Sequence, residues 1–140
     1  MRKLILFLFL VPLLLSFNKI GNSEVYRTAK IDIVLTSKGG CKVHIKGTVK
    51  YTIIPPAIES FSGTVSISGN EGCVNTVLTF AKSNENEANP EVTVDFDRED
   101  VCSVSRIIWH SDAQPEIAEL LNDNSINLGI IRILNSLCND

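Results

Sequence analysis

The chain has 140 residues and a formal net charge of −3, and only 6% of its residues are aromatic. An acidic chain is a poor candidate for binding nucleic acid by bulk charge, and few aromatic side chains are present to stack on bases. Beyond the N-terminal apolar run, no segment reaches membrane-spanning length, so we expect no stable membrane anchor and no nucleic-acid partner.

The first 23 residues have the layout of a secretory signal peptide. Met1-Arg2-Lys3 is cationic, residues 4–15 are apolar, and Gly21 and Ser23 are small residues just before a cut at Glu24. We therefore expect a secreted, extracellular protein in which residues 24–140 form a single β-rich domain. Removing residues 1–23 removes three basic residues and no acid, so the formal charge of this domain is −6.

Residues 25–35 and 41–53 alternate between apolar and polar side chains, which is typical of half-buried strands. Gly39 and Gly40 allow a tight turn between these two segments. Gly47 interrupts the apolar row of the second segment and predicts a bulge or a close approach of two backbones. Pro55-Pro56 is expected to end this strand, because proline has no N–H for the ladder.

Four more strands are expected at 61–68, 73–80, 92–96 and 101–109. Residues 82–91 are rich in Asn and Glu and are expected to form an exposed loop. Six successive strands with short turns predict a mainly β fold, either an antiparallel β-sandwich or a curved sheet. Trp109 is expected to be a buried anchor of the core.

After Trp109 the hydrophobic period changes to that of a helix. Pro115 suits a first helical turn, and Ile117, Leu120 and Leu121 follow on one side. A second stripe predicts another helix, formed by Ile126, Ile130, Ile133, Leu134 and Leu137. A strand at 126–133 is the alternative, because isoleucine is abundant and Gly129 weakens a helix. One or two C-terminal helices should cover a face or an end of the sheet.

Four cysteines permit three pairings, and in an oxidising compartment we expect two disulfides. Cys41 and Cys73 each follow a glycine-containing turn and open a strand of the same sense, which favours a Cys41–Cys73 bridge. Cys102–Cys138 would then tie the helical tail to the sixth strand. No C-x-x-C pair occurs, so a zinc site is not expected.

Two charged clusters are candidate sites. A basic stripe could bind a sulfated glycan, an acidic protein or a phosphorylated headgroup, and consists of Lys38, Lys42, His44, Lys46 and Lys50. The alternative is a solvated strand that lysines protect from unwanted pairing. Asp95, Asp97 and Glu99 are candidate calcium ligands, although their spacing is not that of an EF-hand. Their alternative is a charged loop that faces water.

The sequence does not predict an enzyme. His110-Ser111-Asp112 contains the residue types of a hydrolase triad, but strand neighbours point to opposite faces and a triad is assembled in space. The tripeptide is better explained as a strand end that leads into a helix cap. No cofactor is expected.

The leading interpretation of function is a secreted, non-enzymatic binding or interaction protein on a disulfide-bonded β-sandwich, with a protein partner of unknown identity. The alternative is an extracellular carrier of a lipid or other small apolar ligand, held in the aliphatic interior. A protease inhibitor or an effector-like secreted protein is the third interpretation.

Overall fold

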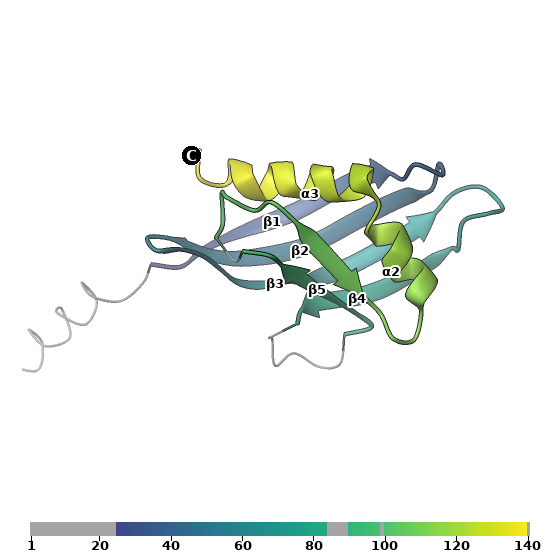
Figure 1. The fold of residues 1–140 in the computed structure, drawn as a ribbon, viewed down its shortest axis with the longest axis horizontal. Helices are drawn as coiled ribbons and strands as arrows, with labels where there is room; N and C mark the ends of the chain where they lie inside the picture. The colour runs from purple at the N-terminus through teal and green to yellow at the C-terminus, as the bar shows by residue number, and fades with distance from the viewer. Residues whose placement is uncertain (1–24, 84–89, 99, 140) are drawn as a thin grey trace, which may run out of the picture.

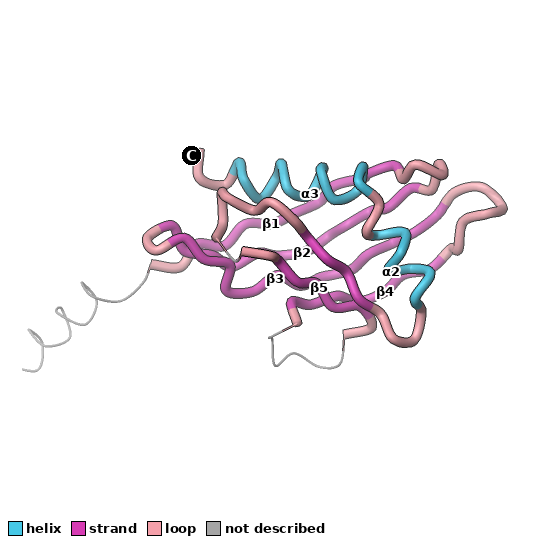
Figure 2. Tube along the Cα trace, viewed as in Figure 1, coloured by secondary structure: helices cyan, strands magenta, loops and turns pink. Residues whose placement is uncertain are grey.

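The computed structural model describes residues 25–83, 90–98 and 100–139. One sheet contains six strands in sequential order (Figures 1 and 2), namely β1 (Arg27–Thr36), β2 (Lys42–Ile53), β3 (Pro56–Ser68), β4 (Thr76–Lys82), β5 (Val92–Phe96) and β6 (Ile107–His110). The helices α2 (Pro115–Leu121) and α3 (Asn124–Ser136) follow. A mainly β fold with six strands and two C-terminal helices is therefore confirmed, in the form of a curved sheet.

The sheet is mixed. Neighbouring strands are antiparallel except β4 and β5, which run parallel and pair from Phe80–Val92 to Lys82–Val94. The alternation in the sequence predicted antiparallel pairing. A strand of five residues carries no signal for its direction, because alternation of apolar and polar residues is the same in both senses.

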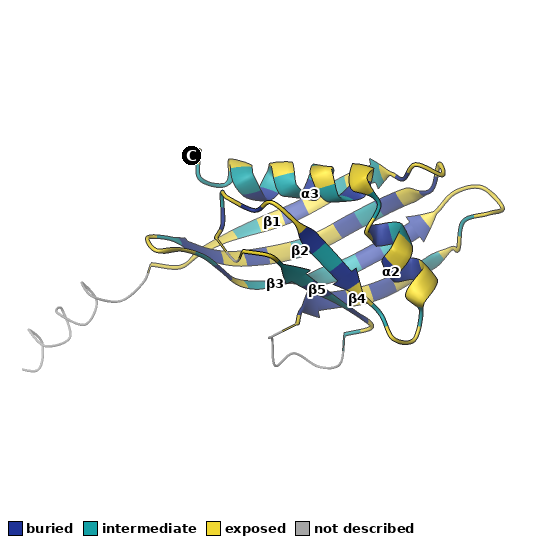
Figure 3. Cartoon of the chain, in the orientation of Figure 1, coloured by how far each residue is buried: buried dark blue, intermediate teal, exposed yellow. Residues whose placement is uncertain are grey.

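The helices and the inward side chains of all six strands form one core. The rings of Phe61 and Phe80 lie 4.9 Å apart, and those of Phe80 and Trp109 lie 5.4 Å apart. Helix α3 runs beside β1 and buries Ile126 and Ile130 completely (Figures 1 and 3). The helical prediction at 126–137 and the burial of Trp109 are thus confirmed.

Gly47 marks a close approach of two backbones, one of the two predicted possibilities. It lies directly opposite Gly63 of β3, and a Cβ atom on Gly47 would lie 2.5 Å from the carbonyl oxygen of Ser62. The ring of Phe80 covers the space that a side chain would fill, with its Cζ 3.0 Å from that position. Only glycine therefore fits where the paired backbones of β2 and β3 approach each other.

Strand β3 begins at Pro56, five residues before the predicted start. Its register to β2 shifts between Lys50, which lies opposite Ser60, and Tyr51, which lies opposite Ile58. The extra residue, Glu59, reverses the alternation, so Ile58 and Phe61 both point into the core. A period of two in the sequence could not reveal this bulge.

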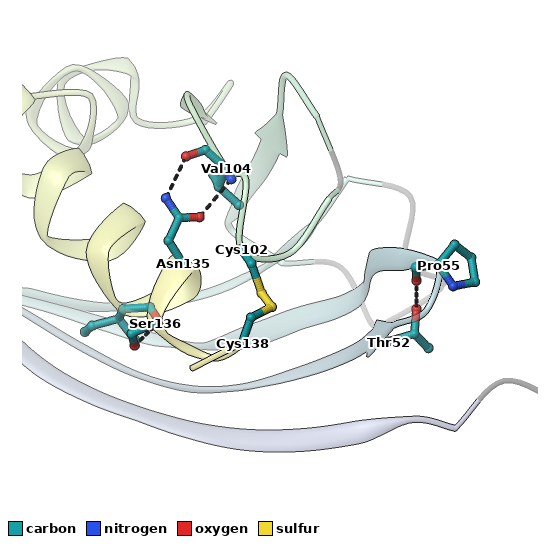
Figure 4. The surroundings of a disulfide bond; sticks show 8 residues. Thr52, Pro55, Cys102, Val104, Asn135, Ser136 and Cys138 are labelled. Carbon is teal, nitrogen blue, oxygen red and sulfur yellow. Dashed lines mark hydrogen bonds between the residues drawn. A yellow bond between two sulfur atoms is a disulfide. The ribbon is translucent and has the colours of Figure 1, made fainter. Parts of the chain in front are cut away.

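The predicted sixth strand was too long at its start. Residues 101–106 are not a strand, and Cys102 has a positive φ of 75°. The side chain of Asn135 holds this segment instead, because it accepts a hydrogen bond from the Val104 N–H (2.8 Å) and donates one to the Val104 carbonyl (3.1 Å; Figure 4).

Two more asparagines bind the outer edge of β6. Asn122 pairs with both backbone groups of Trp109, accepting from its N–H (2.8 Å) and donating to its carbonyl (3.0 Å). Asn127 donates to the carbonyl of Ile107 (3.1 Å) and accepts from the indole of Trp109 (3.3 Å). These amides take the place that a neighbouring strand would occupy.

The structure contains the expected disulfide pairing. Cys41 bonds to Cys73 and Cys102 bonds to Cys138, with Cα atoms 5.7 Å apart in each pair. The second bridge fixes the end of α3 to the segment before β6 (Figure 4). By the loop-entropy model, each bridge stabilises the fold by about 3–4 kcal/mol.

One predicted loop boundary was wrong. Lys82 was assigned to an exposed loop, but it is the last residue of β4 and only 6% exposed. Residues 84–89 of that loop lie outside the described residues, as does the predicted signal peptide.

Candidate binding surface

The helices cover only one face of the sheet. On β2, Val43, Ile45 and Val49 point into the core and are fully buried. The intervening side chains point the other way, and we call the surface they form with their neighbours on β1 and β3 the open face. Its members are Thr28, Lys30, Asp32, Val34 and Thr36 of β1, Lys42, His44, Lys46, Thr48 and Lys50 of β2, and Glu59, Ser60, Ser62, Thr64 and Ser66 of β3.

A row of lysines runs along the centre of the open face. Lys42, Lys46 and Lys50 are exposed and follow one another at intervals of four residues on β2, or about 13 Å. Lys30 of β1 is opposite Thr48, so it adds a fourth ammonium group beside this row. The Nζ atom of Lys50 lies 4.4 Å from the ring centroid of Tyr26, a cation–π contact that orients the lysine at the end of the row.

Asp32 of β1 lies beside the basic row and is paired with His44. Asp32 Oδ1 lies 2.5 Å from Nε2 of His44, and Asp32 is opposite Lys46 in the register. The hydrogen bond from His44 holds the pKa of Asp32 below its ordinary value of 3.8, and the charges of His44 and Lys46 act in the same direction. Asp32 is therefore ionised at neutral pH, and the positive charge of the face exceeds it.

Strand β3 adds a row of hydroxyl groups next to the lysines. Ser62 is opposite Thr48, Thr64 is opposite Lys46, and Ser66 is opposite His44. These side chains can donate and accept hydrogen bonds, so a ligand seated on the lysines would also meet hydroxyls. Their small polar character was evident in the sequence, but their position beside the lysines required the β2–β3 register.

Lys38 does not belong to this row. It lies in the turn between β1 and β2, and its backbone N–H donates a hydrogen bond to Asp123 Oδ2 (2.9 Å) at the start of α3. The positive charge of Lys38 is one of the smaller influences that lower the pKa of Asp123. Of the predicted basic stripe, the structure thus brings together Lys42, His44, Lys46 and Lys50.

Two of the candidate calcium ligands, Asp95 on β5 and Asp97 just after it, are paired with other side chains. Asp95 accepts a hydrogen bond from the Ser83 hydroxyl and lies 3.2 Å from Nε2 of His110, while Asp97 lies 4.0 Å from Arg106. Glu99 lies outside the described residues. Within the described part of the chain, no group of three or more His, Cys, Asp or Glu side chains is placed to hold a metal ion.

Ser83, Asp95 and His110 have the residue types of a hydrolase triad but the wrong order. The carboxylate of Asp95 sits between the hydroxyl and the imidazole, and both contact the carboxylate. In a working triad the imidazole contacts the hydroxyl and accepts its proton. Ser111 Oγ accepts a hydrogen bond from the Gln114 N–H (3.2 Å) in the turn between β6 and α2, whose N-cap residue Gln114 makes no side-chain capping bond.

Two of the hollows in the described segments are lined mainly by polar residue types. One, of about 250 Å³, lies beside Glu91, Thr93 and His110. The other, of about 330 Å³, lies between β6 and the helices, where Asn122 and Asn127 already bind the backbone of β6. Neither has the predominantly apolar lining that is usual for a site for small apolar ligands.

None of the helices in the described segments has the length and apolar character needed to cross a membrane. Comparisons with protein-family models, with curated proteins and with solved structures found no match to this chain.

Proposed function

We propose that this protein is a secreted, non-enzymatic binding protein that holds an anionic macromolecule on its open face. The observation that carries the proposal is the concentration of positive charge on that face. Four lysines lie on it with two acids, namely Asp32, which is bonded to His44, and Glu59 at the bulge of β3. The domain at 24–140 has a formal charge of −6, so this local excess of lysine runs against its overall charge.

The two disulfides support an extracellular location, because such bonds persist in oxidising compartments. The sequence features of residues 1–23 point to the same location. Secretion would bring the open face into contact with the polyanions and acidic proteins of the extracellular space.

An apolar-ligand carrier finds less support. A carrier needs room between the sheet and the helices, but α3 packs tightly on β1, where a side chain on Gly129 would collide with Leu35. The core side chains of α3, such as Ile126 and Leu134, are fully buried. An apolar ligand could enter here only if the helix moved away from the sheet.

The proposal can be tested by placing an N-linked glycan on each side of the molecule. Thr64→Asn creates the acceptor sequence Asn-Val-Ser at 64–66, in the middle of the open face. Ser103→Asn creates the same acceptor sequence at 103–105, on an exposed site of the disulfide-linked segment before β6. Neither variant alters a charged residue, so each glycan acts by obstruction alone.

Both variants and the natural sequence would be secreted from eukaryotic cells and assayed against sulfated glycans, acidic secreted proteins and vesicles of anionic phospholipid. We expect binding to at least one of these probes, unchanged by the glycan at position 103 and abolished by the glycan at position 64. Equal binding by the two glycosylated variants, or no binding by the natural sequence, would contradict the proposal. Failure of both sites to acquire a glycan would contradict secretion.

A further inference from the structure

We infer that the anionic partner is a linear sulfated polysaccharide that lies along β2. This inference rests on the proposed function and names its ligand class. The positive charges form a row rather than a cluster, since Lys42, Lys46 and Lys50 project from the same side of one strand. A linear polymer with regularly repeated negative charges can contact every lysine of such a row at once.

The length of the row sets the length of ligand that it can bind. Lys42 and Lys50 are eight residues apart, which corresponds to about 27 Å along an extended strand. Lys30 lies on the adjacent strand opposite Thr48, between the positions of Lys46 and Lys50, and widens the row there. A sulfated chain of about this length would meet all four ammonium groups.

The hydroxyl row of β3 also favours a sugar polymer. Ser62, Thr64 and Ser66 run parallel to the lysines at the spacing of one strand, about 4.8 Å. They can bond to the hydroxyl and sulfate oxygens of a sugar while the lysines bind its charges. β2 and β3 present no aromatic ring on the open face for stacking on a sugar, and the Tyr26 ring at the end of the lysine row already contacts Lys50, so binding would depend mainly on sulfate.

An anionic membrane fits the open face less well. Membrane-surface proteins usually add apolar side chains that enter the lipid beside their basic residues. β2 and β3 present ammonium, imidazole and hydroxyl groups and the carboxylate of Glu59 to this face. The exposed apolar side chains on this side of the sheet are two single valines, Val34 opposite His44 and Val77 opposite Ser66, and β2 and β3 separate them.

The central test measures binding to heparin oligosaccharides of increasing length, with chemically desulfated heparin as the ligand control. The variant K42Q/K46Q/K50Q removes the row. The matched control R98Q/R106Q/R132Q removes the same charge from exposed arginines outside β1–β4. Thermal unfolding of both variants checks that the fold is retained.

We expect the natural sequence to bind heparin but not its desulfated form, with affinity that rises until the oligosaccharide reaches about 27 Å and then levels off. The lysine variant should bind at least about tenfold more weakly. Its plot of log affinity against log salt should also be less steep by about two to three units. The arginine control should remain within about twofold of the natural sequence.

Asp32→Asn provides a test with the opposite sign. It removes the one acid that competes with sulfate for Lys46, and it should strengthen heparin binding by about two- to fivefold. Weaker binding by this variant would contradict the placement of the ligand beside Lys46.

Two outcomes would overturn the inference: absence of heparin binding at low salt, or equal loss of affinity in the lysine and arginine variants. If heparin fails but an acidic protein binds in a manner blocked by the glycan at position 64, the sulfated ligand is wrong and the proposed function remains. If every probe fails, both are wrong.

Discussion

The covered and open faces of the sheet are built from alternate residues of the same strands, yet they differ in how closely their side chains are constrained. On the covered face, Phe80 fills the space above Gly47, and α3 approaches β1 so closely that a Cβ atom on Gly129 would lie 2.4 Å from Leu35 Cδ2. On the open face, the lysines and serines project into water. The comparison teaches that folding depends mainly on one half of the alternation, which leaves the other half free to carry a binding surface.

The sharpest test of this difference compares two adjacent residues of β3. Phe61→Ala removes a fully buried ring that contacts Phe80 and Phe96, and should lower the free energy of unfolding by about 3–5 kcal/mol. Ser62→Ala, on the open face, should change it by less than about 0.5 kcal/mol. Urea-induced unfolding measures both. Similar losses would show that the open face is also part of the stabilising structure.

A second test concerns the junction between sheet and helices. Asn122→Ala leaves the N–H and the carbonyl of Trp109 without their side-chain partner, and should cost about 2–3 kcal/mol in the free energy of unfolding. Asn124→Ala is the control, because Asn124 is the exposed first residue of α3, and its effect should stay within about 0.5 kcal/mol. Equal losses of stability in Asn122→Ala and Asn124→Ala would contradict a structural role for the asparagine contacts.

The smallest effect is expected at the start of α3. Asp123 accepts hydrogen bonds from the hydroxyl and N–H of Ser125 and from the N–H of Lys38, and the Ser125 hydroxyl contributes most to lowering the pKa of Asp123 below 3.8. Asp123→Ala should lower the free energy of unfolding by about 1 kcal/mol at pH 7.

This contribution should also depend on pH. A carboxyl whose pKa is lowered by folding stabilises the fold above its ordinary pKa, and that stabilisation is lost as the pH falls through the lower, folded value. The gap in melting temperature between the natural sequence and Asp123→Ala should therefore be constant from pH 7 to about 5 and shrink below 3.8. A gap that is independent of pH down to 2 would assign the effect to something other than the ionised cap.

Much of the fold could be predicted because each element has a simple period. Strand β5 occupies the predicted residues, and the stripe from Ile126 to Leu137 identified α3. The start of β3 could not be found, because the bulge at Glu59 shifts the alternation. The direction of β5 and the irregular path of 101–106 depend on contacts between distant residues, such as Asn135 with Val104.

The candidate surface was predictable only in part, for the same reason. Alternation along a single strand was enough to group Lys42, Lys46 and Lys50. The addition of Lys30 and the placement of the serines required the register of three strands, and the separation of Lys38 required its contact with Asp123, 85 positions away. The residues that share a face of one strand can be read from the local sequence. The residues that meet across several strands depend on the register between segments that are distant in the sequence.

The asparagines beside β6 have a consequence for self-association. Because the amides of Asn122 and Asn127 occupy its outer edge, another chain cannot extend the sheet there. In the described part of the chain no strand lies beyond β1, so the outer edge of β1 is where a second copy could add a strand. In a dimer joined through β1, both β1 edges would be paired and both β6 edges would be covered by asparagine side chains. Growth would therefore stop at the dimer instead of continuing into a fibre.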